Sequence, residues 1–194
     1  MKTIPVYKLR TSVDESGNDE VNYIALVADP AIENNWIAFN AIKRFSADKE
    51  RRLIMGVAMI ANMPIYRRDA ERGEHYVVFD RQEVERIVYR FFKKGYNSHF
   101  NIEHDPLRAA PNVYVVGSLL VDERMGVDAP TAFKGVSEGS WIITVKVDDD
   151  KVWDEFVKTG EVKGFSVEGL FTYEAHVDSD EAVLKEIAEI VNSI

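Results

Sequence analysis

The sequence predicts an α+β domain built on a strongly bent antiparallel sheet or small β-barrel of about seven strands, with two or three flanking helices. Short apolar runs bounded by turn residues recur along the chain, as is typical of strands. A few other segments have the apolar spacing of amphipathic helices. Because these helices do not alternate regularly with the strands, a doubly wound parallel sheet is not expected.

The predicted strands lie between turn and breaker residues. The first two flank a polar turn at 14–19, and the second ends at Asp29-Pro30, since proline resists continuation of a strand. The charged segment 44–52 predicts a surface loop, and the polar segment 101–105 predicts a connection that leads into a strand. The expected strands cover residues 4–9, 21–27, 36–39, 53–60, 75–79, 112–121, 140–147 and 162–173.

The clearest helix begins after Asp80. Glu83 follows three residues later, which is the reciprocal capping-box pattern. Gly95 supplies the stop, after two lysines that favour the negative end of the helix. The expected apolar stripe consists of Val84, Ile87, Val88, Phe91 and Phe92.

Two further helices are predicted. One covers residues 148–159 and is closed by Gly160, and the other opens at Asp178. The helix that opens at Asp178 divides the chain into a predicted domain of residues 1–176 and a C-terminal amphipathic helix at 177–194.

The composition excludes several classes of protein. The net charge of −9 argues against sequence-independent nucleic-acid binding, which needs a basic surface. The chain contains no cysteine, which excludes disulfides, thiolate zinc sites and a cysteine nucleophile. No apolar stretch approaches the roughly 18 residues of a membrane span, and the N-terminus lacks the apolar run of a signal peptide. We therefore expect a soluble, intracellular protein.

Ser166 is a candidate nucleophile on the last predicted strand. Alternation along the strand directs Phe165 into the core and directs Ser166 and Glu168 to the opposite face. Gly164 and Gly169 flank the serine and are expected to leave room for a substrate backbone. Glu168 occupies the position where a nucleophile elbow has its second glycine, so an elbow is not expected. A serine on an exposed strand face is also ordinary, and the pattern alone favours that reading.

His104 is a candidate base in the polar segment 101–105. It lies between Glu103 and Asp105, where an imidazole can reach both solvent and substrate, although a plain surface histidine is the more common case. His99 and Glu103 resemble part of an inverted zincin helix, but three residues separate them rather than two. No metal site and no cofactor are therefore expected.

Several segments together resemble the XkdF-like phage serine proteases, a branch of the prohead protease group. The most specific part is GEVKGFSVEG at 160–169, together with the upstream histidine of NIEH at 101–104. The resemblance covers about residues 20–175 in consistent order. The other segments that carry it are 21–32, 56–60, 64–67, 75–79 and 141–147.

The resemblance implies a serine endopeptidase that cleaves the scaffold protein and the major capsid protein inside the immature phage head, in the host cytoplasm. It also implies that Ser166 is the nucleophile and that His104 is the base that takes its proton. Glu168 belongs to the same motif and shares the face of Ser166, so it is the first choice for the third member. The alternatives are Glu103, Asp122 and His176.

Prohead proteases are similar in fold to the herpesvirus maturation protease, which implies a bent barrel and, by analogy, a homodimer. Residues 29–31 resemble a closing strand that ordinary prohead proteases have after the serine, which implies a circular permutation. The chain departs from the family pattern at Ser118-Leu119, where related sequences carry an acid and an aromatic residue. The alternative is a non-catalytic head-assembly protein that keeps the fold.

Overall fold

The apolar runs of the sequence form twelve strands in the computed structural model, which describes residues 4–12, 17–30 and 45–175. The first sheet contains, in spatial order, β12 (Thr172–Ala175), β1 (Val6–Arg10), β6 (Gly73–Val78) and β5 (Ile65–Asp69). The second contains β3 (Ser46–Asp48), β4 (Leu53–Met59), β10 (Trp141–Val147) and β9 (Val113–Leu120). The third contains β11 (Gly164–Gly169), β2 (Val21–Val27), β7 (Phe100–Ile102) and β8 (Asp105–Ala109).

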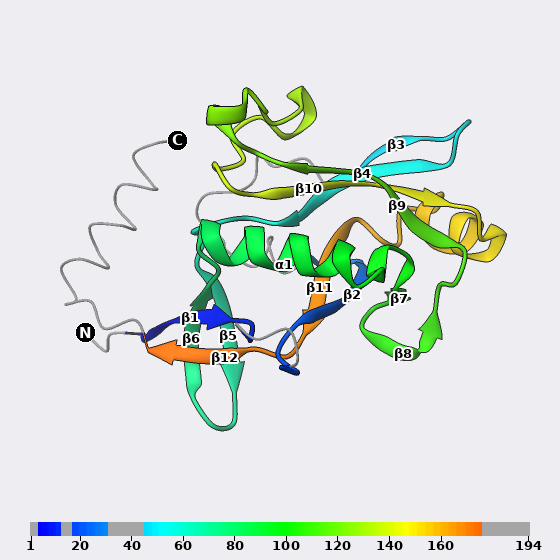
Figure 1. Ribbon diagram of the computed structural model, residues 1–194. Helices are drawn as coiled ribbons and strands as arrows, with labels where there is room; N and C mark the ends of the chain where they lie inside the picture. The colour runs from blue at the N-terminus through cyan, green and yellow to red at the C-terminus, as the bar shows by residue number, and fades with distance from the viewer. Residues whose placement is uncertain (1–3, 13–16, 31–44, 176–194) are drawn as a thin grey trace.

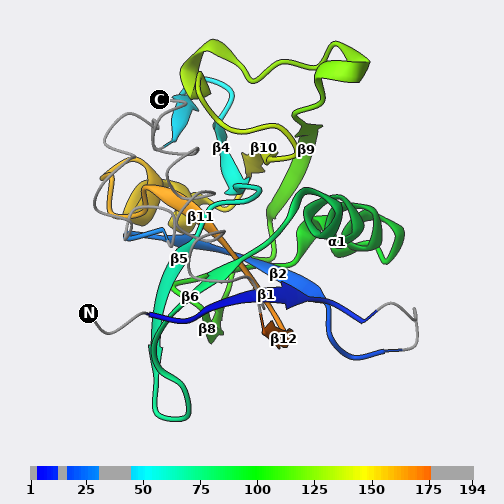
Figure 2. The same ribbon diagram turned by 90° about the vertical axis from the view of Figure 1, so that its left-hand side faces the viewer.

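Two helices accompany the sheets in the described segments, so the predicted α+β class is confirmed. They are α1 (Arg81–Lys93) and the π-helix η4 (Val152–Val157). Figure 1 shows α1 across the front, with β9 and β10 above it and β1 and β12 below; Figure 2 shows it to one side of the sheets. The remaining helical turns are η1 (Tyr96–Ser98), η2 (Glu123–Met125) and η3 (Thr131–Phe133).

The sheets differ from the predicted single antiparallel sheet. The described strands form three separate sheets and do not close into a barrel. Two pairs are parallel, β1 with β6 and β2 with β7. Parallel neighbours need a long crossover between them, and the chain between β2 and β7 supplies one that contains β3 to β6 and α1.

Most predicted strands are present, and the deviations have local causes. The predicted loop 44–52 contains β3, which pairs with β4, and β5 was not predicted. The predicted strand 162–173 is divided at Leu170-Phe171 into β11 and β12. The division follows a bulge after Glu168, where Leu170 N donates to Glu20 O at 3.2 Å. The predicted strand 36–39 and the helix at 177–194 lie outside the described residues.

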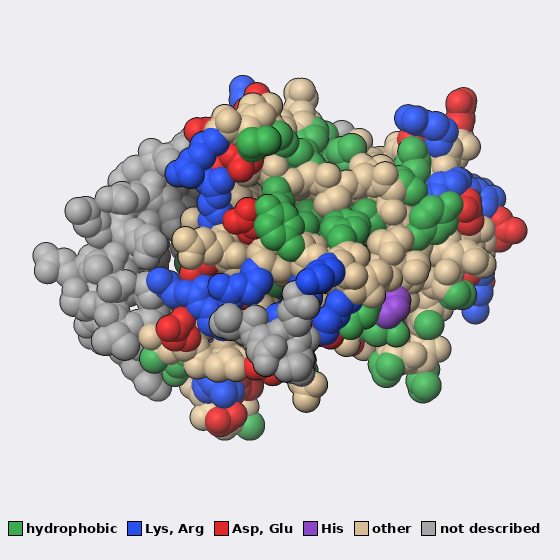
Figure 3. All heavy atoms as spheres, in the orientation of Figure 1, with side chains coloured by type: hydrophobic (Ala, Val, Ile, Leu, Met, Phe, Trp, Pro, Cys, Tyr) green, Lys and Arg blue, Asp and Glu red, His purple; other side chains and the backbone are tan. Residues whose placement is uncertain are grey.

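Helix α1 buries the predicted stripe with one exception. Its buried apolar residues belong to the main core, where the ring of Phe91 meets the buried Trp141 edge-on at 5.4 Å between centroids. Phe92 is 37% exposed, because it lies one residue, about 100°, around the helix from Phe91. Apolar side chains remain exposed over α1 and the adjoining strands in Figure 3, and Tyr89 and Val116 are among the exposed apolar residues.

Both ends of α1 and the C-terminal end of η4 follow the predicted chemistry. The Asp80 carboxylate accepts from Glu83 N at 2.9 Å, which confirms the N-cap. Gly95 has the left-handed φ of 76° that ends α1, and Gly160 has the same φ after η4. At the start of η4, Asp149 accepts from the backbone N–H of Val152 at 2.9 Å.

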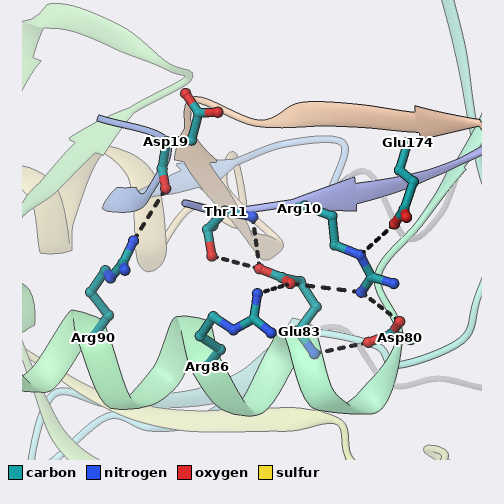
Figure 4. A network of polar contacts seen from close by, with 8 residues as sticks. All are labelled: Arg10, Thr11, Asp19, Asp80, Glu83, Arg86, Arg90 and Glu174. Atoms are coloured by element: carbon teal, nitrogen blue, oxygen red, sulfur yellow. Dashed lines mark hydrogen bonds and ion pairs between the residues drawn. The ribbon is translucent and has the colours of Figure 1, made fainter. Parts of the chain in front are cut away.

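The prediction that the Glu83 side chain completes a reciprocal capping box is wrong. The Glu83 carboxylate is fully buried and turns away from the cap toward the segment after β1, as Figure 4 shows. It accepts from Thr11 N at 2.8 Å and from Thr11 Oγ1 at 2.6 Å. Arg86 Nη1 lies 3.0 Å away and Arg10 Nη1 lies 3.7 Å away, so the buried charge is paired.

Arg10 extends this network from the helix cap to the last described strand. Its guanidinium contacts Asp80 at 2.5 Å and Glu174 at 2.9 Å (Figure 4). Burial acts to raise the pKa of the Asp80 carboxyl, but the Glu83 N–H and the Arg10 guanidinium together hold that pKa below its usual value. The charged groups therefore tie α1, β1 and β12 together.

We expect Glu83→Ala to lower the free energy of unfolding by about 3 kcal/mol, because it leaves the buried Thr11 N–H without its acceptor and the Arg86 guanidinium without this carboxylate. Urea unfolding followed by circular dichroism measures this change. Glu85→Ala is the matched control on the same helix, since the Glu85 carboxylate accepts from the exposed Tyr89 hydroxyl; we expect a change below about 0.5 kcal/mol. Equal effects of the two substitutions would contradict this role of Glu83.

Candidate functional site

The candidate site is organised by β2, the central strand that joins β11 to β7. The antiparallel register with β11 places Ser166 opposite Ala25. The parallel register with β7 places Ala25 beside Asn101. Side chains of laterally paired residues emerge on the same face of a sheet. Ser166, Ala25 and Asn101 therefore form one row across three strands.

The neighbouring row of the same sheet faces the core. It consists of Phe165, Leu26 and Ile102, each no more than 3% exposed and each part of the main core cluster. Ser166 is 9% exposed and belongs to the opposite face, as the alternation of the sequence predicts. Glu168 lies two residues further along β11 and shares that face with Ser166, because the register is regular up to Glu168.

The glycines beside Ser166 serve the chain's own packing, and the prediction that they leave room for a substrate is wrong. A Cβ added at Gly164 would lie 2.5 Å from Cγ of Pro30. A Cβ added at Gly169 would lie 2.1 Å from the carbonyl oxygen of Glu20. Both spaces are already filled, so the glycines allow the segments that flank β2 to approach β11 closely.

His104 lies at the tip of the hairpin formed by β7 and β8, where a polar connection was expected. Ile102 pairs with Asp105, so Glu103 and His104 form a two-residue turn. Their φ values are 57° and 58°, the left-handed backbone of a type I′ turn. Asn and Gly are the residues that such a turn prefers, and another side chain in this conformation costs about 1–2 kcal/mol. Strain of this kind concentrates at functional sites.

The turn is attached to the end of β2 through Glu103. The backbone N–H of Glu103 donates to Leu26 O at 3.0 Å. The Glu103 carboxylate accepts from the backbone N–H of Ala28 at 2.5 Å. This second contact engages the Glu103 side chain with the residue that follows β2 and fixes the position of the turn that carries His104.

Glu168 brings the histidine to the face of Ser166. Its Oε2 lies 3.2 Å from Nδ1 of His104, and the two side chains are 36% and 42% exposed. For Nδ1 to donate to the carboxylate, the neutral ring carries its proton on Nδ1 and leaves Nε2 as an acceptor. A carboxylate at Nδ1 is the arrangement that orients a general base for a serine.

The other candidates for the third member have different partners. Asp122 caps η2 by accepting from Arg124 N and Met125 N, and it pairs with Arg81 at 3.2 Å. His176 lies outside the described residues. Among the described candidates, Glu168 is the carboxylate that contacts His104. At the departure from the family pattern, Ser118 Oγ accepts from the indole N–H of Trp141 at 2.9 Å.

Among the described residues, Ser166 and His104 make no direct hydrogen bond; both are related to Glu168, Ser166 through the strand and His104 through a side-chain contact. Two residues along a strand span about 6.6 Å, so Ser166 and Glu168 are neighbours on the same face of β11. The Glu168 carboxylate contacts His104. Within the described part of the chain, the Ser166 hydroxyl makes no hydrogen bond. Catalytic hydrogen bonds of unliganded enzymes are often long and tighten only when substrate binds.

Asn101 is a member of the site that sequence reasoning missed. Its Nδ2 donates to Glu168 Oε2 at 2.9 Å, the same oxygen that His104 approaches. The residue is only 2% exposed, and its buried Oδ1 has no hydrogen-bond partner among the described residues. Its position in the segment NIEH was visible in the sequence, but the contact with Glu168 depends on the register of three strands.

The other described histidines have different surroundings. His75 is fully buried in the first sheet, with Nδ1 3.0 Å from Gly73 O and its ring edge-on to Tyr7 and Tyr173. His99 has Nδ1 3.1 Å from Asn22 O. In residues 4–12, 17–30 and 45–175 no group of three or more His, Asp or Glu side chains could hold a metal ion. No helix of these segments has the length and apolar character that a membrane span requires.

We expect His104→Gly to raise the free energy of unfolding by about 1 kcal/mol, because glycine removes the strain of the left-handed backbone at φ 58°. The lost contact with Glu168 is an exposed pair and contributes about 0–1 kcal/mol. Urea unfolding of the two proteins measures the difference. A marked loss of stability would show that the side-chain contact of His104 outweighs the backbone strain.

Comparisons of this chain with protein-family models, with curated proteins and with solved structures found no match. We therefore infer function from the arrangement of Ser166, Glu168 and Asn101 on one face of the third sheet, with His104 against Glu168.

Proposed function

We propose that this chain is a phage prohead serine endopeptidase that cleaves the scaffold protein and the major capsid protein during capsid maturation. Ser166 is the nucleophile, His104 the general base and Glu168 the carboxylate that orients the base. The observation that carries the proposal is the contact of Glu168 with Nδ1 of His104, from the strand and the face that also bear Ser166. Neither a cofactor nor a metal ion takes part in this chemistry.

The proposed reaction follows from the roles of these three groups. Nε2 of His104 takes the proton of the Ser166 hydroxyl as Oγ bonds to the peptide carbonyl carbon. The resulting imidazolium gives that proton to the departing amine as the C–N bond breaks, which leaves an ester on Ser166. Water, deprotonated by the same imidazole, then hydrolyses the ester and restores the hydroxyl.

The carboxylate of Glu168 contributes in two ways. It fixes the orientation of the imidazole through Nδ1, and its negative charge stabilises the imidazolium that forms in each step. The exposure of both side chains leaves them open to an approaching peptide. In this account, a bound peptide excludes water and closes the Ser166–His104 hydrogen bond.

The proposal includes the fold and setting that the family resemblance implies. The chain acts inside the prohead in the host cytoplasm, as a homodimer with a circularly permuted prohead-protease fold. The alternative is a head-assembly protein that has the same fold without the chemistry. A Ser166 hydroxyl that makes no hydrogen bond to the described residues is compatible with either function, whereas the Glu168–His104 contact favours the enzyme.

We expect the wild-type protein to cleave its cognate scaffold and major capsid proteins, and we expect Ser166→Ala and His104→Ala each to reduce the rate by about 10⁴-fold or more. Gel electrophoresis and mass spectrometry of the fragments measure cleavage. His99→Ala is the matched control, since His99 directly precedes β7 of the same sheet but contacts the Asn22 carbonyl; we expect it to retain activity. Absence of cleavage by all the proteins would favour the assembly function.

A further inference from the structure

We propose that Asn101 is a positioning residue that fixes the Glu168 carboxylate for His104. This inference rests on the proposed function and adds a fourth member to its site. Asn101 Nδ2 donates to Glu168 Oε2 at 2.9 Å, and His104 Nδ1 lies 3.2 Å from the same oxygen. Glu168 Oε2 is therefore contacted by two nitrogen atoms, Asn101 Nδ2 from β7 and His104 Nδ1 from the turn that follows β7.

The strand register explains how Asn101 reaches Glu168. Asn101 belongs to the row of Ser166 and Ala25. Glu168 lies two residues further along β11, on the same face of the sheet. The residue between Asn101 and β11 is Ala25, whose side chain is a single methyl group and leaves the diagonal path open. A larger residue at this position of β2 would separate the amide from the carboxylate.

The orientation of the Asn101 amide favours a role in the site over a role in packing. The amide is buried, and its Oδ1 has no partner among the described residues. Turning the amide around would place Oδ1 against the carboxylate oxygen, where two acceptors repel each other. The Nδ2 donor therefore faces Glu168, whereas the Oδ1 acceptor has no partner in the described part of the chain. An apolar side chain of similar shape would avoid the unpaired acceptor but would lose the contact with Glu168.

The contact acts on His104 through Glu168. A carboxylate held at a fixed point favours the imidazole tautomer with the proton on Nδ1, which leaves Nε2 free to take the proton of Ser166. Without Asn101, the partly exposed Glu168 side chain would turn toward solvent, and this preference would weaken.

The test is the tautomer of His104, read from the ¹⁵N and ¹³C ring shifts at a pH where the ring is neutral. We expect the Nδ1–H tautomer to dominate in the wild type and its ratio to the Nε2–H tautomer to fall at least about threefold in Asn101→Leu. We expect the unfolding midpoint of this variant to stay the same or rise, because it no longer buries an unpaired acceptor. The control is Asn112→Ala, an exposed asparagine that should leave the His104 shifts unchanged.

Cleavage gives a second measurement on the same variants. We expect Asn101→Leu to lower kcat by between about tenfold and 100-fold with little change in KM, because misplacement of the base affects the chemical step. A variant that keeps the wild-type tautomer ratio and kcat would overturn the inference. If the leucine variant does not fold, the tautomer ratio of His104 is measured in Asn101→Ala instead, and the same fall in the ratio is expected.

The two proposals fail in different ways. If the wild type does not cleave, or if Ser166→Ala still does, the proposed function fails, and the His104 spectrum still reports whether Asn101 controls the imidazole. If cleavage requires Ser166 and His104 but neither kcat nor the tautomer responds to Asn101, only the positioning role is wrong.

Discussion

The pairing of β2 with β11 on one side and β7 on the other is the constraint on which the candidate site depends. Side chains alternate along a strand, so a slip of one residue would exchange the two faces of the sheet. Such a slip would bring Ser166 into the main core and would move Phe165, which is 1% exposed in the native register, to the face that now carries Ser166 and Asn101. Burial of Phe165, Leu26 and Ile102 thereby fixes the face on which Ser166, Glu168 and Asn101 meet.

The ends of this ladder are fixed by close backbone contacts. Gly169 lies against the Glu20 carbonyl, and the bulge before it turns the chain from β11 into β12. β12 then pairs with β1, and Glu83 holds the residue after β1 against α1. The buried carboxylate of α1 is thus connected, through two strands, to the strand that carries Ser166.

Local sequence signals predicted a large part of the fold. Helix α1 follows from the Asp80 cap, a regular apolar stripe and Gly95, because each acts within a few residues. β2 and β10 follow from apolar runs that lie between clear breaks. The hairpin at 103–104 was missed, because its turn lacks the Asn-Gly pair that usually identifies one. The parallel pairings were missed since they join segments that are far apart in the chain.

The candidate site divides in the same way. Alternation alone placed Ser166 and Glu168 on one face, and the structure has them there. The choice of His104 came from a family resemblance, and its contact with Glu168 depends on a strained turn that no local pattern indicates. Asn101 could not be found from the sequence, since its partner is 67 residues away and lies across an intervening strand. The flanking glycines were misinterpreted because their neighbours, Pro30 and Glu20, are distant in sequence.

The most direct test of the central claim, that His104 activates Ser166, needs no cognate substrate. A fluorophosphonate probe reacts with activated serines, and mass spectrometry of the digested protein identifies the modified residue. The account predicts modification of Ser166 in the wild type, with a rate that falls by about 100-fold or more in His104→Ala. Absence of modification at Ser166, or an equal rate without the imidazole, would contradict it.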